Sequence, residues 1–262
     1  MPPARPLIEA IYRYPVKGLS AQRLARTRLA ARETIAADRL YAIENGPCGF
    51  DPAAPVHLPK VRFLMLMRNE RLAALRTEFD ESSHVLVVSA GGCDLARGDL
   101  RTAEGRAAIE TLFSRHCADD LRGAPKVLSA PGHSFSDVKQ KVVSIINLAS
   151  VAAIGKALGA RVNPLRFRGN IYVDGWPAWR EFDFVGREIR LGSSARLRVI
   201  KRITRCAATH VDPETGTRDL MILEALADAF GHTDCGVYAE VAVGGDIAPG
   251  DAVDGAEIAG EI

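Results

Sequence analysis

The second half of the sequence breaks into short apolar runs separated by turn-forming residues. Four of these runs are rich in β-branched or aromatic residues, which predicts short strands. They are NIYVD at 170–174, EIRL at 188–191, LRVIKRI at 197–203 and VYAEVAV at 237–243. The chain then closes with the turns Gly244-Gly245-Asp246 and Pro249-Gly250-Asp251. Strands this short, each followed by a tight turn, suit a small barrel.

The rest of the sequence mixes strands with helices. Strands are predicted over 7–29, interrupted by a turn at 15–18, and over 38–43, 84–89 and 142–147. Helices are predicted over 62–75, 101–117, 149–158 and 219–230, the third of them closed by Gly159. The expected fold class is therefore α+β and rich in strands.

A segment rich in Gly and Pro, GAPKVLSAPG at 123–132, is the best candidate for a joint within the chain. We predict an N-terminal β-barrel-like domain with a few helices over 1–122 and a β-barrel domain over 123–262. The 262 residues, 47% of them hydrophobic, are enough for two closely packed domains with an ample core.

The charges of the chain nearly balance. Lys and Arg number 34 against 32 Asp and Glu, a formal net charge of +2. No overall field would draw the protein to nucleic acid or to an anionic membrane, so any anion site must be local. The sequence also has no long uncharged apolar run, and we expect a cytoplasmic protein without a membrane partner.

The five cysteines are an odd number without a C-x-x-C pair. This spacing argues against a disulfide framework, a zinc ribbon and an iron–sulfur site. Cys206 has the most unusual setting, because Lys201, Arg202, Arg205 and His210 lie around it in KRITRCAATHVDP. Basic neighbours favour a thiolate, so Cys206 is a buried filler, a nucleophile with His210 as a weak candidate base, or a metal ligand.

Three further clusters combine basic and amide groups. They are YPVKG at 14–18, Asp38-Arg39, and RFRGN at 166–170. Lysine and arginine suit phosphate, and asparagine suits the edge of a heterocycle. A phosphate-bearing cofactor would unite the clusters, whereas separate solvated surface charges are the simpler interpretation of each. Trp176 and Trp179 predict a loop held by aromatic packing, with a substrate lid as the alternative.

These segments together closely resemble the MOSC family, named after the C-terminal part of molybdenum cofactor sulfurase, preceded by its N-terminal β-barrel partner. The N-terminal resemblance rests on YPVKG and on Asp38-Arg39-Leu40. The C-terminal resemblance rests on an ordered series of motifs: Phe135-Ser136-Asp137, RFRGNIYVDG, TRC with VDPETG, Gly245-Asp246-Ile247, and Pro249-Gly250-Asp251.

The resemblance implies a set of site residues. Cys206 corresponds to the cysteine that binds molybdenum in relatives such as the mitochondrial amidoxime-reducing component. The cofactor-binding positions implied are Lys17, Arg39, Lys60, Arg168, Asn170, Thr204 and Arg205. Lys60 stands in for a residue of a T-x-R segment, and Gly18 stands where relatives often have serine.

The implied cofactor is molybdopterin carrying molybdenum. The implied activity is reduction of amidoximes or hydroxylamines, with electrons from a separate ferredoxin or flavoprotein donor, and proteins of cofactor biosynthesis are further candidate partners. A carrier of molybdenum cofactor or of a persulfide is the main alternative, and a cysteine hydrolase is a third. Pyridoxal phosphate is not expected, because in sulfurases it belongs to a separate aminotransferase domain.

Overall fold

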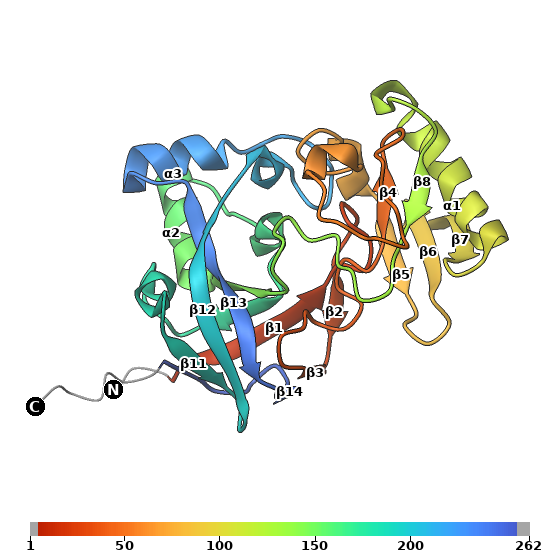
Figure 1. The fold of residues 1–262 in the computed structure, drawn as a ribbon. Helices are drawn as coiled ribbons and strands as arrows, with labels where there is room; N and C mark the ends of the chain where they lie inside the picture. Colours follow the sequence, from red (N-terminus) through yellow and green to blue (C-terminus); the bar gives the residue numbers. More distant parts are fainter. Residues whose placement is uncertain (1–4, 256–262) are drawn as a thin grey trace, which may run out of the picture.

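The computed structural model describes residues 5–255, and within them it has fifteen strands and three α-helices (Figure 1). The helices are α1 (Ala103–His116), α2 (Leu148–Leu158) and α3 (Ile222–Phe230). The strands are β1 (Leu7–Arg13), β2 (Gln22–Leu24), β3 (Thr27–Leu29), β4 (Ala42–Glu44), β5 (Arg76–Phe79), β6 (Val85–Ala90), β7 (Cys93–Asp99), β8 (Lys126–Leu128), β9 (Val143–Asn147), β10 (Ile171–Asp174), β11 (Glu188–Leu191), β12 (Ala195–Thr204), β13 (Asp234–Val243), β14 (Gly245–Ile247) and β15 (Val253–Gly255). The predicted fold class, α+β and rich in strands, is confirmed.

The largest sheet closes on itself. Its strand order is β15-β11-β12-β13-β9-β10-β1-β2. A bridge between Leu7 and Ala252 joins β1 to the chain that enters β15, and the Ile8 amide donates to the Asp251 carbonyl at 2.8 Å. The other half of the same β1 edge pairs with β2, through Ile11 and Arg13. The sheet is therefore a barrel, and its first strand comes from the beginning of the described chain (Figure 1).

The apolar side chains of strands that alternate apolar and polar residues fill the interior of the barrel. Along β12, Ala195, Leu197 and Val199 are buried, and the residues between them are exposed. The same core includes Ile8 and Ile11 of β1 together with residues from the later strands of the ring. The period of two thus separates a packed interior from a charged outer surface.

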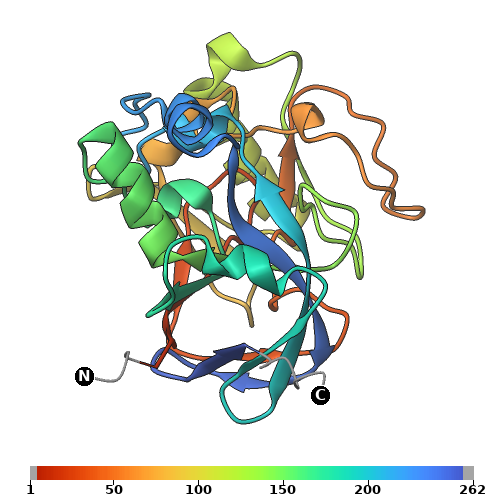
Figure 2. The same ribbon diagram turned by 90° about the vertical axis from the view of Figure 1, so that its left-hand side faces the viewer.

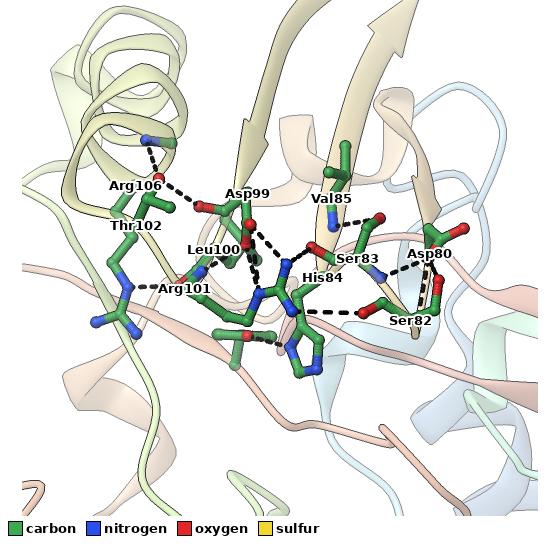
Figure 3. A network of polar contacts seen from close by, with 12 residues as sticks. Asp80, Ser82, Ser83, His84, Val85, Asp99, Leu100, Arg101, Thr102 and Arg106 are labelled. Atoms are coloured by element: carbon green, nitrogen blue, oxygen red, sulfur yellow. Dashed lines mark hydrogen bonds and ion pairs between the residues drawn. The ribbon is translucent and has the colours of Figure 1, made fainter.

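A second unit packs α1 against the sheet β5-β6-β7. Its core contains Phe79, Leu86, Leu100, Ile109 and Phe113. Figure 3 shows the polar network at one end of this unit, where Arg101 and Asp99 join the turn before α1 to the turn before β6. The Arg101 guanidinium donates to the Asp99 carboxylate at 2.8 Å and to the Ser83 carbonyl at 2.7 Å. The Thr102 hydroxyl caps α1 by accepting from the Gly105 amide at 3.0 Å.

The helices α2 and α3 lie side by side over one part of the barrel (Figure 2). Val151 and Ile154 of α2 pack with Leu226 of α3 and with Tyr172 on the outer face of β10. Among residues 5–255, no helix combines the length and the apolar character that a bilayer span requires.

Pairing between strands links the beginning of the chain to its end. Strands β1 and β2 belong to the large sheet, β3 pairs with β14, and β4 pairs with β8. The division into domains at residues 122 and 123 stays a prediction. The large sheet and the pairs β3-β14 and β4-β8 combine strands from both parts, whereas β5-β6-β7 lies within the first part.

Most of the predicted elements are confirmed. Strands lie at 84–89, 142–147, 170–174, 188–191, 197–203 and 237–243, and helices at 101–117, 149–158 and 219–230, with small shifts at their ends. Gly159 ends α2 in the left-handed conformation, with φ 63°.

The predicted helix over 62–75 is wrong. The segment forms turns and two short 3-10 helices, η1 (Lys60–Arg62) and η2 (Glu70–Ala74). Four consecutive residues, Phe63 to Leu66, are buried, whereas an amphipathic helix buries only one face. The Asn69 side chain stabilises the turn by accepting from the Met65 amide at 3.0 Å.

The predicted strand over 38–43 begins later than expected, at Ala42. Asp38 and Arg39 lie in the preceding turn, where Arg39 has φ 54°. The Asp38 carboxylate accepts from the Tyr14 amide at 2.8 Å, so the turn is held against the end of β1.

Gly18 gives a test of local backbone constraint. It has φ +84°, and a Cβ atom there would lie 2.7 Å from the Leu64 carbonyl oxygen. Gly18→Ala should therefore lower the free energy of unfolding by about 2–4 kcal/mol, measured by denaturant titration. Gly49 has φ +75° with nothing within 4 Å of its Cβ position, so Gly49→Ala should cost only about 1 kcal/mol. Equal losses in the two variants would contradict the steric argument.

Candidate functional site

A cavity of about 340 Å³ lies where the barrel meets the N-terminal part of the chain. All eight residues that the sequence predicted for the site line it: Lys17, Arg39, Lys60, Arg168, Asn170, Thr204, Arg205 and Cys206. They come from the turn after β1, the turn before β4, η1, the segment between η4 (Pro164–Phe167) and β10, and the end of β12. The structure thus brings together residues that are far apart in sequence.

The charges around this cavity are strongly unbalanced. Eight of its lining residues are lysine or arginine, and one, Asp137, is acidic. The basic residues are Lys17, Arg39, Lys60, Arg166, Arg168, Lys201, Arg202 and Arg205. A concave site with this composition concentrates positive potential and favours an anionic ligand.

Cys206 lies at the end of β12, directly before η6 (Ala207–His210). It is partly exposed, whereas Cys48, Cys117 and Cys235 are buried and the exposed Cys93 lies outside the cavity. The Thr209 amide and hydroxyl both donate to the Cys206 carbonyl at 3.0 Å, which fixes the backbone behind the thiol. Of the described cysteines, Cys206 alone faces the cavity.

Lys60 lies close to the Cys206 side chain. Burial by itself would lower the pKa of Lys60, but the Cys206 sulfur and the Asp137 carboxylate raise that pKa overall. The Lys60 ammonium is 4.0 Å from the Asp137 carboxylate. A positive charge is thus held beside the thiol.

An ion pair joins the buried Lys17 to Asp137, whose side chain is 48% exposed. The Lys17 ammonium donates to the Asp137 carboxylate and, at 2.8 Å, to the Phe135 carbonyl. Burial lowers the pKa of Lys17, and Asp137 opposes this effect. Burial would raise the pKa of Asp137, but Lys17 outweighs it and brings that pKa to about 2. Asp137 is therefore ionised near neutral pH and provides a negative charge beside the Lys17 ammonium.

Arg39 and Arg168 both contact the ring of Tyr14. Their guanidinium carbons lie 4.8 Å and 4.2 Å from the ring centroid. Arg39 also pairs with Asp38 and donates to the Arg168 carbonyl at 3.2 Å. Arg168 has φ 50°, and in the described part of the chain its side chain has no ion pair. Burial lowers the pKa of Arg168, and Tyr14, Asp137 and Asp38 partly oppose this effect.

Three of the predicted cofactor residues use their polar atoms within the protein. The Asn170 amide oxygen accepts from the Ser144 amide and hydroxyl, and its nitrogen donates to the Tyr12 carbonyl at 3.2 Å. Arg205 donates to the Cys235 carbonyl and, at 2.8 Å, to the Phe167 carbonyl. The Thr204 hydroxyl donates to Asp234 at 2.7 Å. Their geometry is that of residues that position the cavity wall, and their contacts with a cofactor stay predictions.

The sequence did not single out several lining residues. Asp137 lies in the quoted Phe135-Ser136-Asp137 motif, so its signal was present. Arg166, in the RFRGN cluster, binds Asp212 at 3.0 Å and Asp219 at 2.7 Å. Tyr238 of β13 also lines the cavity, and an apolar strand pattern gives no indication of such a role.

The candidate general base of a cysteine hydrolase, His210, does not lie beside Cys206 in the cavity. His210 is buried and does not line the cavity. Its Nε2 atom accepts from the Leu223 amide at 3.3 Å and lies 3.3 Å from the Glu224 carboxylate. His210 thus holds the start of α3.

Trp176 and Trp179 do not line the cavity either. Trp176 packs on Phe184 in the barrel core, and Trp179 packs on Phe230 with ring centroids 4.7 Å apart. The two tryptophans hold their loop by aromatic packing.

The Lys17–Asp137 pair gives a test with a defined pH dependence. Asp137→Asn should lower the free energy of unfolding at pH 7 by about 1–3 kcal/mol, because the buried ammonium loses its counter-ion. The pKa of Asp137 is lower in the folded protein, so this stabilisation is present above about pH 4 and is lost as the pH falls towards 2.

The control is Asp183→Asn, which breaks the exposed pair with Arg180. It should change the free energy of unfolding by less than about 1 kcal/mol. Denaturant titrations from pH 3 to 8 measure both variants. A loss for Asp137→Asn that stays constant over this range would contradict the ion-pair argument.

Comparisons with known proteins agree with the resemblance. The MOSC N-terminal beta barrel domain matches residues 5–122, and the MOSC domain matches residues 124–254. The YuaD protein from Bacillus subtilis is 12% identical, with a TM-score of 0.46 over 95% of this chain and 94% of that chain. YiiM from Geobacillus stearothermophilus is 18% identical, with a TM-score of 0.33 over 44% of this chain and 54% of that chain. A search of curated proteins found no match. Because the two family models together span nearly all of it, the chain belongs to the MOSC family.

Proposed function

We propose that this protein binds molybdenum cofactor at the Cys206 cavity and reduces N-hydroxylated substrates. MOSC domains are associated with binding of this cofactor. The observation that carries the proposal is a partly exposed cysteine in a cavity lined by eight basic residues and one acidic residue. Such a cavity offers a soft metal ligand together with sites for phosphate.

The donor set fits a phosphate-bearing pterin. Arg168 offers a guanidinium that forms no ion pair with any residue of 5–255 and is held in place on the Tyr14 ring. Lys17 and Arg39 lie beside it, each already fixed by one carboxylate. Cations that are positioned but not fully neutralised are suited to a phosphate dianion. These three residues would hold the phosphate end of the cofactor.

The metal would depend on ligands from the cofactor. Among residues 5–255, no cluster of three or more His, Cys, Asp or Glu side chains could hold a metal ion. Cys206 would therefore supply one thiolate, and the dithiolene of the pterin would supply two more sulfurs. A cavity with one thiol among basic residues suits a metal that takes one sulfur from the protein and two from the cofactor.

When bound, molybdenum would supply two-electron chemistry that removes oxygen from an N–O bond. The balanced reaction converts R–NH–OH, two electrons and two protons to R–NH₂ and water. The chain's own residues hold and orient the cofactor: Cys206 binds, Lys60 keeps a positive charge beside the sulfur, and Asn170 and Arg205 stiffen the wall. We propose a separate protein donor, of the ferredoxin or flavoprotein type, for the electrons.

The first test is Cys206→Ser, expressed in a host that makes molybdenum cofactor. Molybdenum and released pterin per chain should be near one in the wild type and clearly reduced in the variant. Reduction of benzamidoxime with an artificial electron donor should fall at least about 100-fold. The melting temperature should stay within a few degrees of the wild type, because the side chain is partly exposed.

Cys93→Ser is the matched control, since Cys93 is an exposed cysteine outside the cavity. It should keep metal, pterin and activity. A large fall in the melting temperature of Cys206→Ser would favour the buried-filler interpretation. Bound cofactor without turnover, or a persulfide on Cys206 without pterin, would support the carrier alternative instead.

A further inference from the structure

A second cavity, of about 210 Å³, adjoins the candidate site. The residues that line both cavities are Gly18, Leu66, Arg166, Arg168 and Ala208. Most of the other residues around the second cavity are apolar, among them Leu19, Ala21, Ala73, Leu165 and Val211. A mainly apolar cavity thus lies directly beside a strongly basic one.

The two cavities meet at Arg168. Its guanidinium carbon lies 4.2 Å from the ring centroid of Tyr14, which lines the second cavity and not the first. Cys206, Lys60 and Thr204, by contrast, line the first cavity and not the second. The second cavity therefore opens from the end of the site that we assign to the phosphate of the cofactor, whereas the proposed metal ligand belongs to the first cavity alone.

Only one of the two guanidinium groups at this junction is neutralised by a carboxylate of the described chain. Arg166 pairs with Asp212 at 3.0 Å and with Asp219 at 2.7 Å. Arg168 forms no ion pair with any residue of 5–255. A phosphate group at the junction would therefore be held by Arg168, and atoms attached to that phosphate could continue into the second cavity.

The polar part of the second cavity includes two exposed side chains, those of Arg76 and Glu214. Arg76 donates to the Ala73 carbonyl at 2.9 Å and to the Pro213 carbonyl at 3.1 Å, which fixes η2 relative to the turn after η6. In the described part of the chain, the Glu214 carboxylate accepts one long hydrogen bond, from Asn163 at 3.5 Å. A carboxylate with free acceptor positions beside apolar surface suits a heterocycle that carries an amino group.

We propose that the second cavity holds the base of a dinucleotide form of molybdenum cofactor, in which a nucleoside monophosphate is joined to the phosphate of the pterin. This inference rests on the proposed function, because it requires the pterin phosphate to lie beside Arg168. The apolar residues would surround the base, and Glu214 would accept from an amino group of guanine or cytosine. An apolar cavity of roughly 150 Å³ is enough to bind benzene, so the second cavity has room for a nucleobase.

The test is the composition of the purified, cofactor-loaded protein, expressed in a host that makes both the nucleotide-free and the dinucleotide forms of the cofactor. Molybdenum, phosphate and the nucleotides released by mild acid are measured per chain. The protein should contain twice as much phosphate as molybdenum, with GMP or CMP equal to molybdenum. Equal phosphate and molybdenum without a released nucleotide would overturn the inference.

Two variants test the place of the base. Ala21→Leu puts a larger side chain into the wall of the second cavity at a partly exposed position, and should lower the nucleotide per chain several-fold. Glu214→Ala removes an exposed carboxylate, so folding should be unaffected, and it should also lower the nucleotide per chain. Melting temperatures check that both variants are folded.

The matched control is Ala225→Leu, at a partly exposed position of α3 that lines neither cavity. It should keep the wild-type nucleotide content. An equal loss in this control, or an unchanged content in both cavity variants, would show that the second cavity is not the place of the base.

Activity separates this inference from the proposed reaction. If the protein contains the dinucleotide form and reduces no N-hydroxylated compound, the inference stands and the reaction is wrong. If it reduces benzamidoxime with nucleotide-free cofactor, the reaction stands and the inference is wrong. Nucleotide bound without pterin would show a separate nucleotide site, and would overturn both the dinucleotide and the cofactor assignment.

Discussion

Lys17 and Asp137 are 120 positions apart in the sequence and form an ion pair at the cavity wall. The Lys17 side chain is 7% exposed, so its charge depends on that partner and on the Phe135 carbonyl. The pair fixes the turn after β1 against the segment that precedes β9, which are two sides of the same cavity. The placement of Arg39, Lys60 and Cys206 around one cavity depends on this junction between the two parts of the chain.

Aromatic rings have a second organising role around the cavity. Arg168 lies on Tyr14, and Lys201 and Arg202 lie near Tyr238 and Phe182, whereas Arg39 lies on Tyr14 and also pairs with Asp38. A carboxylate partner would hold a cation equally well but would cancel its field. Ring faces position the guanidinium and ammonium groups at a small electrostatic cost, so the cavity keeps an excess of positive charge. An enclosed excess of this kind selects anions more strongly than the same charges would on an open surface.

The sequence was sufficient where local patterns decide the structure. Alternating runs such as EIRL became strands, and Gly159 ended its helix as its position indicated. The pattern failed over 62–75, because burial of Phe63 to Leu66 on all sides comes from tertiary packing. Periodicity cannot report contacts with distant segments.

In the candidate site, too, the sequence motifs indicated some features, and others depend on tertiary contacts. Motifs indicated Cys206 and the basic residues, and the structure gathers them in one cavity. The motifs could not show that the amide of Asn170 is occupied by Ser144 and Tyr12, because those partners lie on other strands. Nothing in the sequence indicated that Tyr238 lines the cavity, since a tyrosine in an apolar strand is usually part of the core. Its role in the wall follows from barrel geometry.

Closure of the barrel also has a consequence for synthesis of the protein. One edge of β1 is paired early by β2 over its second half, but the first half of that edge meets its neighbour only at residues 250–253, near the end of the described chain. During translation the first half of this edge stays unpaired until residues 250–253 have left the ribosome. Contacts this distant in sequence slow folding and prolong exposure of an unpaired strand edge. The covering of that edge, in part by the early strand β2, is therefore a safeguard while the chain is being made.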